Sequence, residues 1–205
     1  MISQFDKIDG ELRNKMPHGK SLVFAPHPDD EVFGCGGAII RHVQQGDEVK
    51  VVIGTDGGFP VHESQEAEDY PILRKQESLA ASQVLGYGQP EFLAYPDGFL
   101  VTDEKLITHL LEIIEQFQPQ NIYLPAETEI HPYHLALCSA GKKTAGRYNK
   151  GVSLIFYEVG QPIKPNLFHD ITNLQQQLER AMDCFVSQLA VQDYKKQITA
   201  LHIYR

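Results

Sequence analysis

Two short segments of the chain concentrate side chains that bind metal ions. Residues 26–31 read Pro-His-Pro-Asp-Asp-Glu, and residues 127–134 read Glu-Thr-Glu-Ile-His-Pro-Tyr-His. Imidazoles and carboxylates are ligands for zinc and similar divalent cations. His27 and Asp30 are three residues apart across a predicted strand-to-helix turn, so both can point at one spot. His134 would complete three ligands with positions left open for water, as in catalytic zinc sites.

The neighbouring residues fit a hydrolytic reaction. A divalent cation lowers the pKa of a bound water to about 7 and so supplies a nucleophile at neutral pH. Asp29 is adjacent to Asp30, should point elsewhere, and could accept the proton of this water. His131, as an imidazolium, could stabilise a tetrahedral oxyanion or protonate a departing amine. The alternative is structural, because aspartates that follow a strand commonly cap helices.

Short apolar runs alternate with longer helical patterns along the chain. The patterns predict strands over residues 22–25, 49–54, 91–95, 121–124 and 153–159, and helices over 31–45, 72–85, 103–117, 172–185 and 193–204. This alternation indicates an α/β fold, a three-layer sandwich with crossover helices between parallel strands. If the strand order is 3-2-1-4-5, the first and fourth strands are neighbours, and the two His-rich segments meet where such sheets bind ligands.

Length, charge and cysteine content narrow the class of protein. A length of 205 residues fits a single domain over residues 1–205. The formal net charge of −9 argues against partners such as nucleic acid or an anionic membrane, because these bind proteins through a positively charged surface. No apolar run reaches the about 20 residues of a transmembrane segment, and the polar start does not resemble a signal peptide. Three widely spaced cysteines suit a reducing compartment, so a cytoplasmic location is expected.

Several of these segments resemble one known family. Residues 25–31, followed by Gly-Cys-Gly-Gly at 34–37, are similar to the signature of the PIG-L/LmbE-like N-acetylglucosaminyl de-N-acetylases. The likeness covers roughly residues 20–190 and continues in the family's order through Thr55-Asp56-Gly57, Arg74 with Glu77, residues 95–98, residues 131–134 and Ser187-Gln188. The first motif is specific by itself, and the others gain weight from their order.

The resemblance implies a fold, a metal and a reaction. The fold would be Rossmann-like, with a mostly parallel sheet. The metal would be zinc, with another divalent ion such as Fe²⁺ as an alternative. The reaction would remove the N-acetyl group from a small amino-sugar substrate that contains N-acetylglucosamine. The roles carried over are metal binding for His27, Asp30 and His134, general base for Asp29, oxyanion stabiliser or acid for His131, and substrate contact for Arg74 and Asp97.

One position departs from the family's pattern. The second motif usually reads His-Pro-Asp-His, whereas this chain has Tyr133 at the acidic position. The missing carboxylate would normally hold His131 charged and oriented by opposite-charge pairing. Another carboxylate could take its place, with Glu129, Glu127 and Asp97 as candidates. Alternatively, Tyr133 faces solvent and the loss is tolerated.

Other interpretations stay open. One is an amidase that cleaves a larger amide on an amino sugar, and another is a non-catalytic Rossmann-like nucleotide-binding module. The glycines of residues 34–37 do not favour the nucleotide module, because they lie beyond the turn that a dinucleotide would occupy; close helix–sheet packing explains them better. The acidic loop over residues 56–70 is long enough to cover the site. Self-association into a homo-oligomer also stays open.

Overall fold

Five parallel strands form the central sheet in the part of the chain that the structure, a computed structural model, describes: residues 11–13, 16–58 and 66–205. The strands are β2 (Ser21–Ala25), β3 (Val49–Thr55), β4 (Glu91–Tyr95), β5 (Asn121–Pro125) and β6 (Ser153–Tyr157). Their order across the sheet is β4-β3-β2-β5-β6. This order confirms the expected one, and it places β2 directly beside β5, the two strands that precede the His-rich segments.

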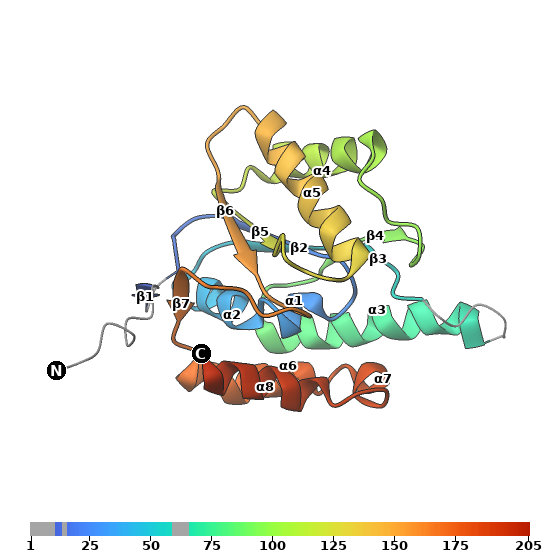
Figure 1. The fold of residues 1–205 in the computed structure, drawn as a ribbon, viewed down its shortest axis with the longest axis vertical. Helices are drawn as coiled ribbons and strands as arrows, with labels where there is room; N and C mark the ends of the chain where they lie inside the picture. Colours follow the sequence, from blue (N-terminus) through green and yellow to red (C-terminus); the bar gives the residue numbers. More distant parts are fainter. Residues whose placement is uncertain (1–10, 14–15, 59–65) are drawn as a thin grey trace.

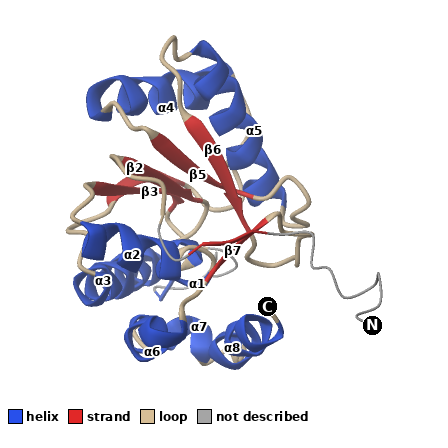
Figure 2. Ribbon diagram, turned by 90° about the vertical axis from the view of Figure 1, so that its left-hand side faces the viewer, coloured by secondary structure: helices blue, strands red, loops and turns tan. Residues whose placement is uncertain are grey.

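Helices cover both faces of this sheet (Figure 1). On one face lie α4 (Glu104–Phe117) and α5 (Pro132–Arg147), and on the other lie α1 (Asp30–Phe33), α2 (Gly36–Gln45) and α3 (Glu66–Leu85). Outside this second group pack α6 (Gln175–Met182), α7 (Val186–Leu189) and α8 (Tyr194–Tyr204) (Figure 2). The architecture is the expected α/β sandwich, with additional helices from the last part of the sequence outside one layer.

Strand β2 is buried on both sides, which fixes the position of the segment that follows it. Val23 and Ala25 pack into the core cluster on the side of α2, whereas Leu22 and Phe24 pack into the cluster on the side of α4 and α5. Side chains alternate between the faces of a strand, and a parallel sheet covered on both faces needs apolar residues at every position. The end of β2 is therefore held rigidly where it leads into Pro26 and His27.

The single helix expected over residues 31–45 is two helices, α1 and α2, which are separated at Gly34 and Cys35. Close packing explains the glycines here. A Cβ atom at Gly34 would lie 2.6 Å from the ring of Tyr157, and one at Gly37 would lie 2.7 Å from Ile171. The expected close packing of helix on sheet is therefore seen at Gly34, which faces β6, whereas Gly37 packs against the segment before η1.

Some elements were not anticipated from the sequence. Helix α5 begins directly after His131, with Pro132 at its first position, where proline is well tolerated. Helix α3 begins at Glu66, earlier than expected. Two short strands, β1 (Glu11–Arg13) and β7 (Leu167–His169), pair in parallel, and the 3-10 turn η1 (Thr172–Leu174) precedes α6. Within the described residues, no helix is long and apolar enough to cross a membrane.

Candidate metal and catalytic site

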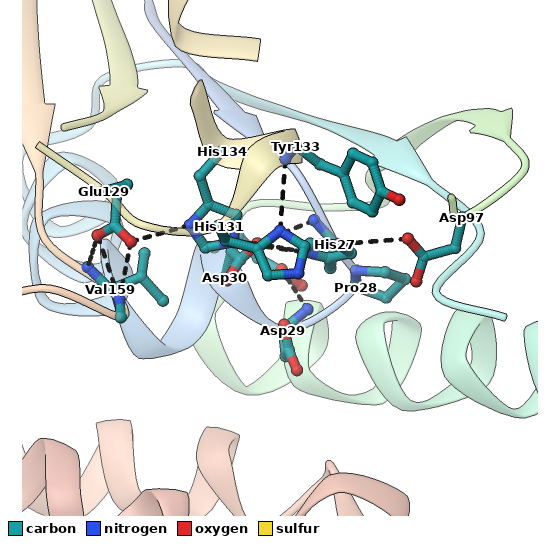
Figure 3. A network of polar contacts seen from close by, with 12 residues as sticks. His27, Pro28, Asp29, Asp30, Asp97, Glu129, His131, Tyr133, His134 and Val159 are labelled. Atoms are coloured by element: carbon teal, nitrogen blue, oxygen red, sulfur yellow. Dashed lines mark hydrogen bonds and ion pairs between the residues drawn. The ribbon is translucent and has the colours of Figure 1, made fainter. Parts of the chain in front are cut away.

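The three predicted metal ligands meet at the carboxyl ends of β2 and β5 (Figure 3). His27 follows β2, Asp30 begins α1, and His134 lies in the first turn of α5. Asp30 Oδ2 lies 3.1 Å from His27 Nδ1 and 3.2 Å from His134 Nε2, and the two ring nitrogens are 3.3 Å apart. The three donor atoms therefore form a nearly equilateral triangle, which we call the ligand triangle.

The ligand triangle fits a divalent cation. Metal–ligand bonds of about 2.0–2.1 Å in a tetrahedral site separate the donor atoms by about 3.3 Å. Burial alone would lower the pKa values of His27 and His134, but the carboxylates beside them raise these values to about 9 and about 10. A cation bound here would take the place of those protons, and metal binding at such sites releases protons. His131 adds a third imidazole, with ligand atoms within 4.8 Å of those of the other two histidines.

Glu129 supports the ligand triangle from behind. Its side chain is fully buried, and Oε2 lies 3.2 Å from His134 Nδ1. The other oxygen, Oε1, accepts a hydrogen bond from the backbone N–H of Val159 at 2.8 Å. A carboxylate on the far nitrogen of a ligating histidine fixes its tautomer and orientation. From the sequence, Glu129 was a candidate partner of His131, but in the structure Glu129 contacts His134. The only sequence feature that pointed to this pair is that Glu129 lies five residues before His134.

Asp29 points away from the ligand triangle, as its adjacency to Asp30 suggested. It occupies the N-cap position of α1, yet its side chain makes no capping hydrogen bond. Its φ of 148° lies in a region that residues other than glycine rarely adopt, a form of strain that is found at functional sites. Burial raises the pKa of the Asp29 carboxyl to about 6, although the guanidinium of Arg74 opposes this shift. Such a carboxylate can accept and release a proton near neutral pH.

Arg74 is buried behind Asp29. Its Nη2 atom donates to Asp29 Oδ2 at 2.9 Å and also to the carbonyl oxygen of Pro28. On the other side, Nη1 lies 3.4 Å from Glu77 Oε2, and Glu77 is held by Ser187 through its N–H and its hydroxyl, each at 2.7 Å. The Arg74 side chain is 2% exposed, so in this structure its polar contacts orient Asp29. Contact between Arg74 and substrate stays a prediction.

Asp97 lies beside His27 on the side away from Glu129. Its Oδ1 atom is 3.5 Å from His27 Nε2, as Figure 3 shows. The turn that carries it is held by Asp56, whose Oδ1 accepts the N–H of Asp97 at 2.9 Å. Asp97 thus lies at the ring nitrogen of His27 that is not part of the ligand triangle, and its contact with substrate stays a prediction. Residues 59–65, in the loop expected to cover the site, lie outside the described residues.

His131 has no carboxylate partner among the residues that the structure describes. Of the three candidates, Glu129 contacts His134, Asp97 contacts His27, and Glu127 pairs with Lys142 on the surface. His131 Nδ1 instead accepts the backbone N–H of Tyr133 at 3.4 Å. Burial and the two neighbouring histidines lower the pKa of His131.

Tyr133 is not a purely solvent-facing replacement for the missing acid. Its ring is half-buried, and its centroid lies 5.0 Å from that of His131 and 5.8 Å from that of His27. Both contacts are edge-on, with interplanar angles of 63°. Tyr133 therefore forms a wall of the site.

A sequence profile of the family described as PIG-L: GlcNAc-PI de-N-acetylase matches residues 22–145, more than half of the chain. The chain belongs to this family. The matched range runs from β2 into α5 and contains the ligand triangle and Asp29. The expected resemblance is thereby confirmed.

Individual relatives of this PIG-L family member include deacetylases and a hydratase. The probable N-acetyl-alpha-D-glucosaminyl L-malate deacetylase 2 of Bacillus cereus is 31% identical over 137 residues, which are 63% of this chain and 62% of that protein. The match thus spans less than two thirds of the Bacillus protein. Diacetylchitobiose deacetylase of Thermococcus kodakarensis is 25% identical over 82% of this chain and 70% of its own length. The 4-oxalmesaconate hydratase of Pseudomonas putida is 24% identical over 89% of this chain and 79% of its own length.

Solved structures share the fold. A conserved protein from Thermus thermophilus superposes with a TM-score of 0.78 at 26% identity, over 90% of this chain and 86% of that one. The N,N'-diacetylchitobiose deacetylase from Pyrococcus horikoshii gives a TM-score of 0.69 at 26% identity, over 80% of this chain and 68% of that one. These similarities confirm the predicted Rossmann-like α/β class.

Proposed function

We propose that this chain is a metal-dependent hydrolase that removes the N-acetyl group from a small substrate containing N-acetylglucosamine. The observation that carries the proposal is the ligand triangle of His27, Asp30 and His134, with Asp29 directly before Asp30 in the same turn. Two imidazoles and one carboxylate leave coordination positions open for water and substrate, as catalytic zinc sites do. Zinc is the proposed ion, with Fe²⁺ as the alternative, because borderline divalent ions accept this donor set.

The residues around the ligand triangle fit the steps of amide hydrolysis. A bound divalent ion supplies a water that is acidic enough to lose a proton near pH 7 and polarises the acetamide carbonyl. Asp29, oriented by Arg74, accepts the proton as the water attacks. His131 accepts at Nδ1, so its proton resides on Nε2, from which it donates to the tetrahedral oxyanion. Asp29 then returns the proton to nitrogen as the C–N bond breaks, which releases acetate and a free amine.

A larger amide substrate is a second candidate, and exposed apolar side chains near the site favour it. Phe99 follows the Asp97 turn and is 71% exposed, and Ile130 precedes His131 and is 73% exposed. Apolar residues on both site loops could pack against an acyl chain or an apolar group on the sugar. Comparing acetyl with longer N-acyl groups on the same sugar separates this candidate from a deacetylase.

Hydration is a third chemistry, because the Pseudomonas relative is named a hydratase of a carboxylate-bearing compound. Among the described residues that contact the ligand triangle or Asp29, Arg74 is the only arginine or lysine, and it is already paired with Asp29 and Glu77. A substrate with several carboxylates would lack cationic partners here. The charge of the site therefore favours a neutral sugar amide. A non-catalytic nucleotide-binding module is not favoured, because the turn after β2 carries the ligands themselves.

The test is acetate release from N-acetylglucosamine, N,N'-diacetylchitobiose and N-acetylglucosaminyl malate. We expect release by the wild-type protein and a loss of about 100-fold or more in Asp29→Asn, which removes the proposed base. Asp183→Asn is the matched control, because Asp183 is an aspartate outside the proposed site and pairs with Lys195 at the surface. If Asp29→Asn released acetate as fast as wild type with the same metal content, the proposed role of Asp29 would be wrong.

A further inference from the structure

The hydroxyl of Tyr133 is a polar group at the site whose surroundings are described in part by the structure. It makes no hydrogen bond to any residue that the structure describes, although the Tyr133 backbone N–H is engaged with His131. The hydroxyl instead lies over the turn at Gly98, 3.7 Å from the position that a Cβ atom would take there. A phenol hydroxyl in a half-buried position normally finds a polar partner. Its free donor therefore points to something that binds in the site.

Tyr133 and Asp97 lie beside His27 and come from two different parts of the fold. Tyr133 lies on the first turn of α5, and its ring contacts His27 edge-on. Asp97 lies in the turn after β4, with Oδ1 3.5 Å from His27 Nε2. Figure 3 shows the Tyr133 hydroxyl on the side of its ring that faces Asp97. A phenol donor and a carboxylate acceptor thus lie on the same side of the ligand triangle.

This side of the site is held in place. The N–H of Asp97 donates to Asp56 Oδ1 at 2.9 Å, and the N–H of Gly98 donates to Asp97 Oδ1 at 3.0 Å. Gly98 has a φ of 99°, a conformation that side-chain-bearing residues rarely adopt. Further along the same loop, Thr102 Oγ1 donates to the carbonyl oxygen of Ala136 in α5 at 2.8 Å, which ties this loop to the helix that carries Tyr133. The pair is therefore preorganised.

We propose that Tyr133 is a specificity residue that donates a hydrogen bond to one hydroxyl of the substrate sugar, while Asp97 accepts one from the same hydroxyl. The inference rests on the proposed amino-sugar hydrolysis. A sugar hydroxyl both donates and accepts, so it can satisfy a phenol and a carboxylate together. The edge of the tyrosine ring adds an apolar wall beside the sugar. In this chain the residue at the position of the family's acid thus binds substrate and leaves His131 to be oriented by the backbone.

The test combines one variant with a set of substrates. We would measure kcat and KM for acetate release from N-acetylglucosamine and from its 3-deoxy, 4-deoxy and 6-deoxy analogues, with wild type and Tyr133→Phe. A neutral hydrogen bond gives an expected drop in kcat/KM of about 3- to 10-fold for N-acetylglucosamine, mainly through KM. On the analogue that lacks the contacted hydroxyl, wild type and Tyr133→Phe should be equally active, because neither protein can form the hydrogen bond with that substrate. Tyr204→Phe is the control, since Tyr204 is 80% exposed at the end of α8.

Three outcomes would overturn the inference. One is an unchanged kcat/KM in Tyr133→Phe, and another is an equal loss on every deoxy analogue, which would show that the hydroxyl acts only on the protein. The third is a lower zinc content, which would show an effect on the ligand triangle. If wild type released no acetate from any sugar, the proposed function itself would fail and this inference with it. Acetate release with any of the first three outcomes would overturn the role of Tyr133 alone.

Discussion

Glu129 Oε2 lies 3.2 Å from His134 Nδ1, on the opposite side of the imidazole from the ligand triangle. The carboxylate is also held by backbone N–H groups of Val159 and Gly160, at 2.8 and 3.2 Å. These bonds and His134 hold the pKa of Glu129 below its usual value, although burial acts against them. The loop after β6 therefore positions a carboxylate, which in turn orients a predicted ligand on α5.

Removing the charge of Glu129 should weaken metal binding. In Glu129→Gln the amide nitrogen would meet N–H donors or His134, so one contact is lost whichever way the amide is oriented. Loss of a carboxylate behind a ligating histidine typically lowers metal affinity by about 10- to 100-fold. Zinc titration against a competing chelator measures this change. Glu127→Gln is the matched control, because Glu127 is exposed and pairs with Lys142; equal zinc affinity in the two variants would contradict the role of Glu129.

Arg74→Ala should destabilise the fold strongly. The substitution leaves the buried carboxylates of Asp29 and Glu77 without their cation, and breaking a buried ion pair in this way costs about 3–5 kcal/mol. Urea unfolding in the presence of a chelator measures the change without a contribution from bound metal. Arg147→Ala is the comparison, because its pair with Glu104 is exposed and should leave the midpoint nearly unchanged. Similar midpoints for the two variants would mean that Arg74 is not a structural cation.

Asp47 gives a pH-dependent contribution to stability far from the predicted ligands. Its Oδ2 lies 2.8 Å from His42 Nδ1, and its Oδ1 accepts the N–H of Gly19 at 3.1 Å. Burial acts to raise the pKa of Asp47, but these partners lower it to about 2. Because the folded pKa lies below the unfolded value, the stabilisation is present above about pH 4 and is lost as the pH falls towards 2.

The variant Asp47→Asn should therefore differ from wild type in a pH-dependent way. We expect its free energy of unfolding to be about 1–2 kcal/mol lower at pH 6, and the difference to shrink between pH 4 and pH 2. Urea unfolding at a series of pH values provides the measurement. A difference that stays constant from pH 6 down to pH 2 would show that ionisation of Asp47 is not involved.

Two glycines of α5 should respond in opposite ways to alanine. A Cβ atom at Gly141 would clash with Leu124 of β5, so Gly141→Ala should cost about 1–3 kcal/mol and displace the helix that carries His134. At Gly146 nothing lies within 4 Å of the added atom, and Gly146→Ala should stabilise the helix by about 0.5–1 kcal/mol. Thermal unfolding separates the two; equal shifts would contradict the packing of α5 on β5.

The sequence was sufficient for the elements whose periodicity is strong. The apolar runs gave the five strands and their order, and that order brings His27 and His134 together. Helix α5 was missed because its pattern is weakly amphipathic and contains Gly141 and Gly146, which lower helix propensity. The pairing of β1 with β7 joins residues far apart in sequence, and three-residue strands carry too little periodicity to be recognised.

The predicted roles at the site depended on what spacing can encode. His27 and Asp30 lie on one turn, so their convergence followed from their separation. The partner of Glu129 could not be predicted from spacing, because the choice between His131 and His134 depends on where α5 begins. Similarly, the burial of Arg74 behind Asp29 arises from packing of α3 against the turn after β2, which no local pattern records.

The most direct test of the account is acetate release from N-acetylglucosamine conjugates by protein stripped of metal with a chelator and then titrated with zinc. We predict that the stripped protein is inactive and that activity returns in proportion to zinc, up to one ion per chain. His134→Ala should neither bind zinc tightly nor regain activity, because one corner of the ligand triangle is gone. Full activity in protein shown by elemental analysis to contain no metal would contradict the account.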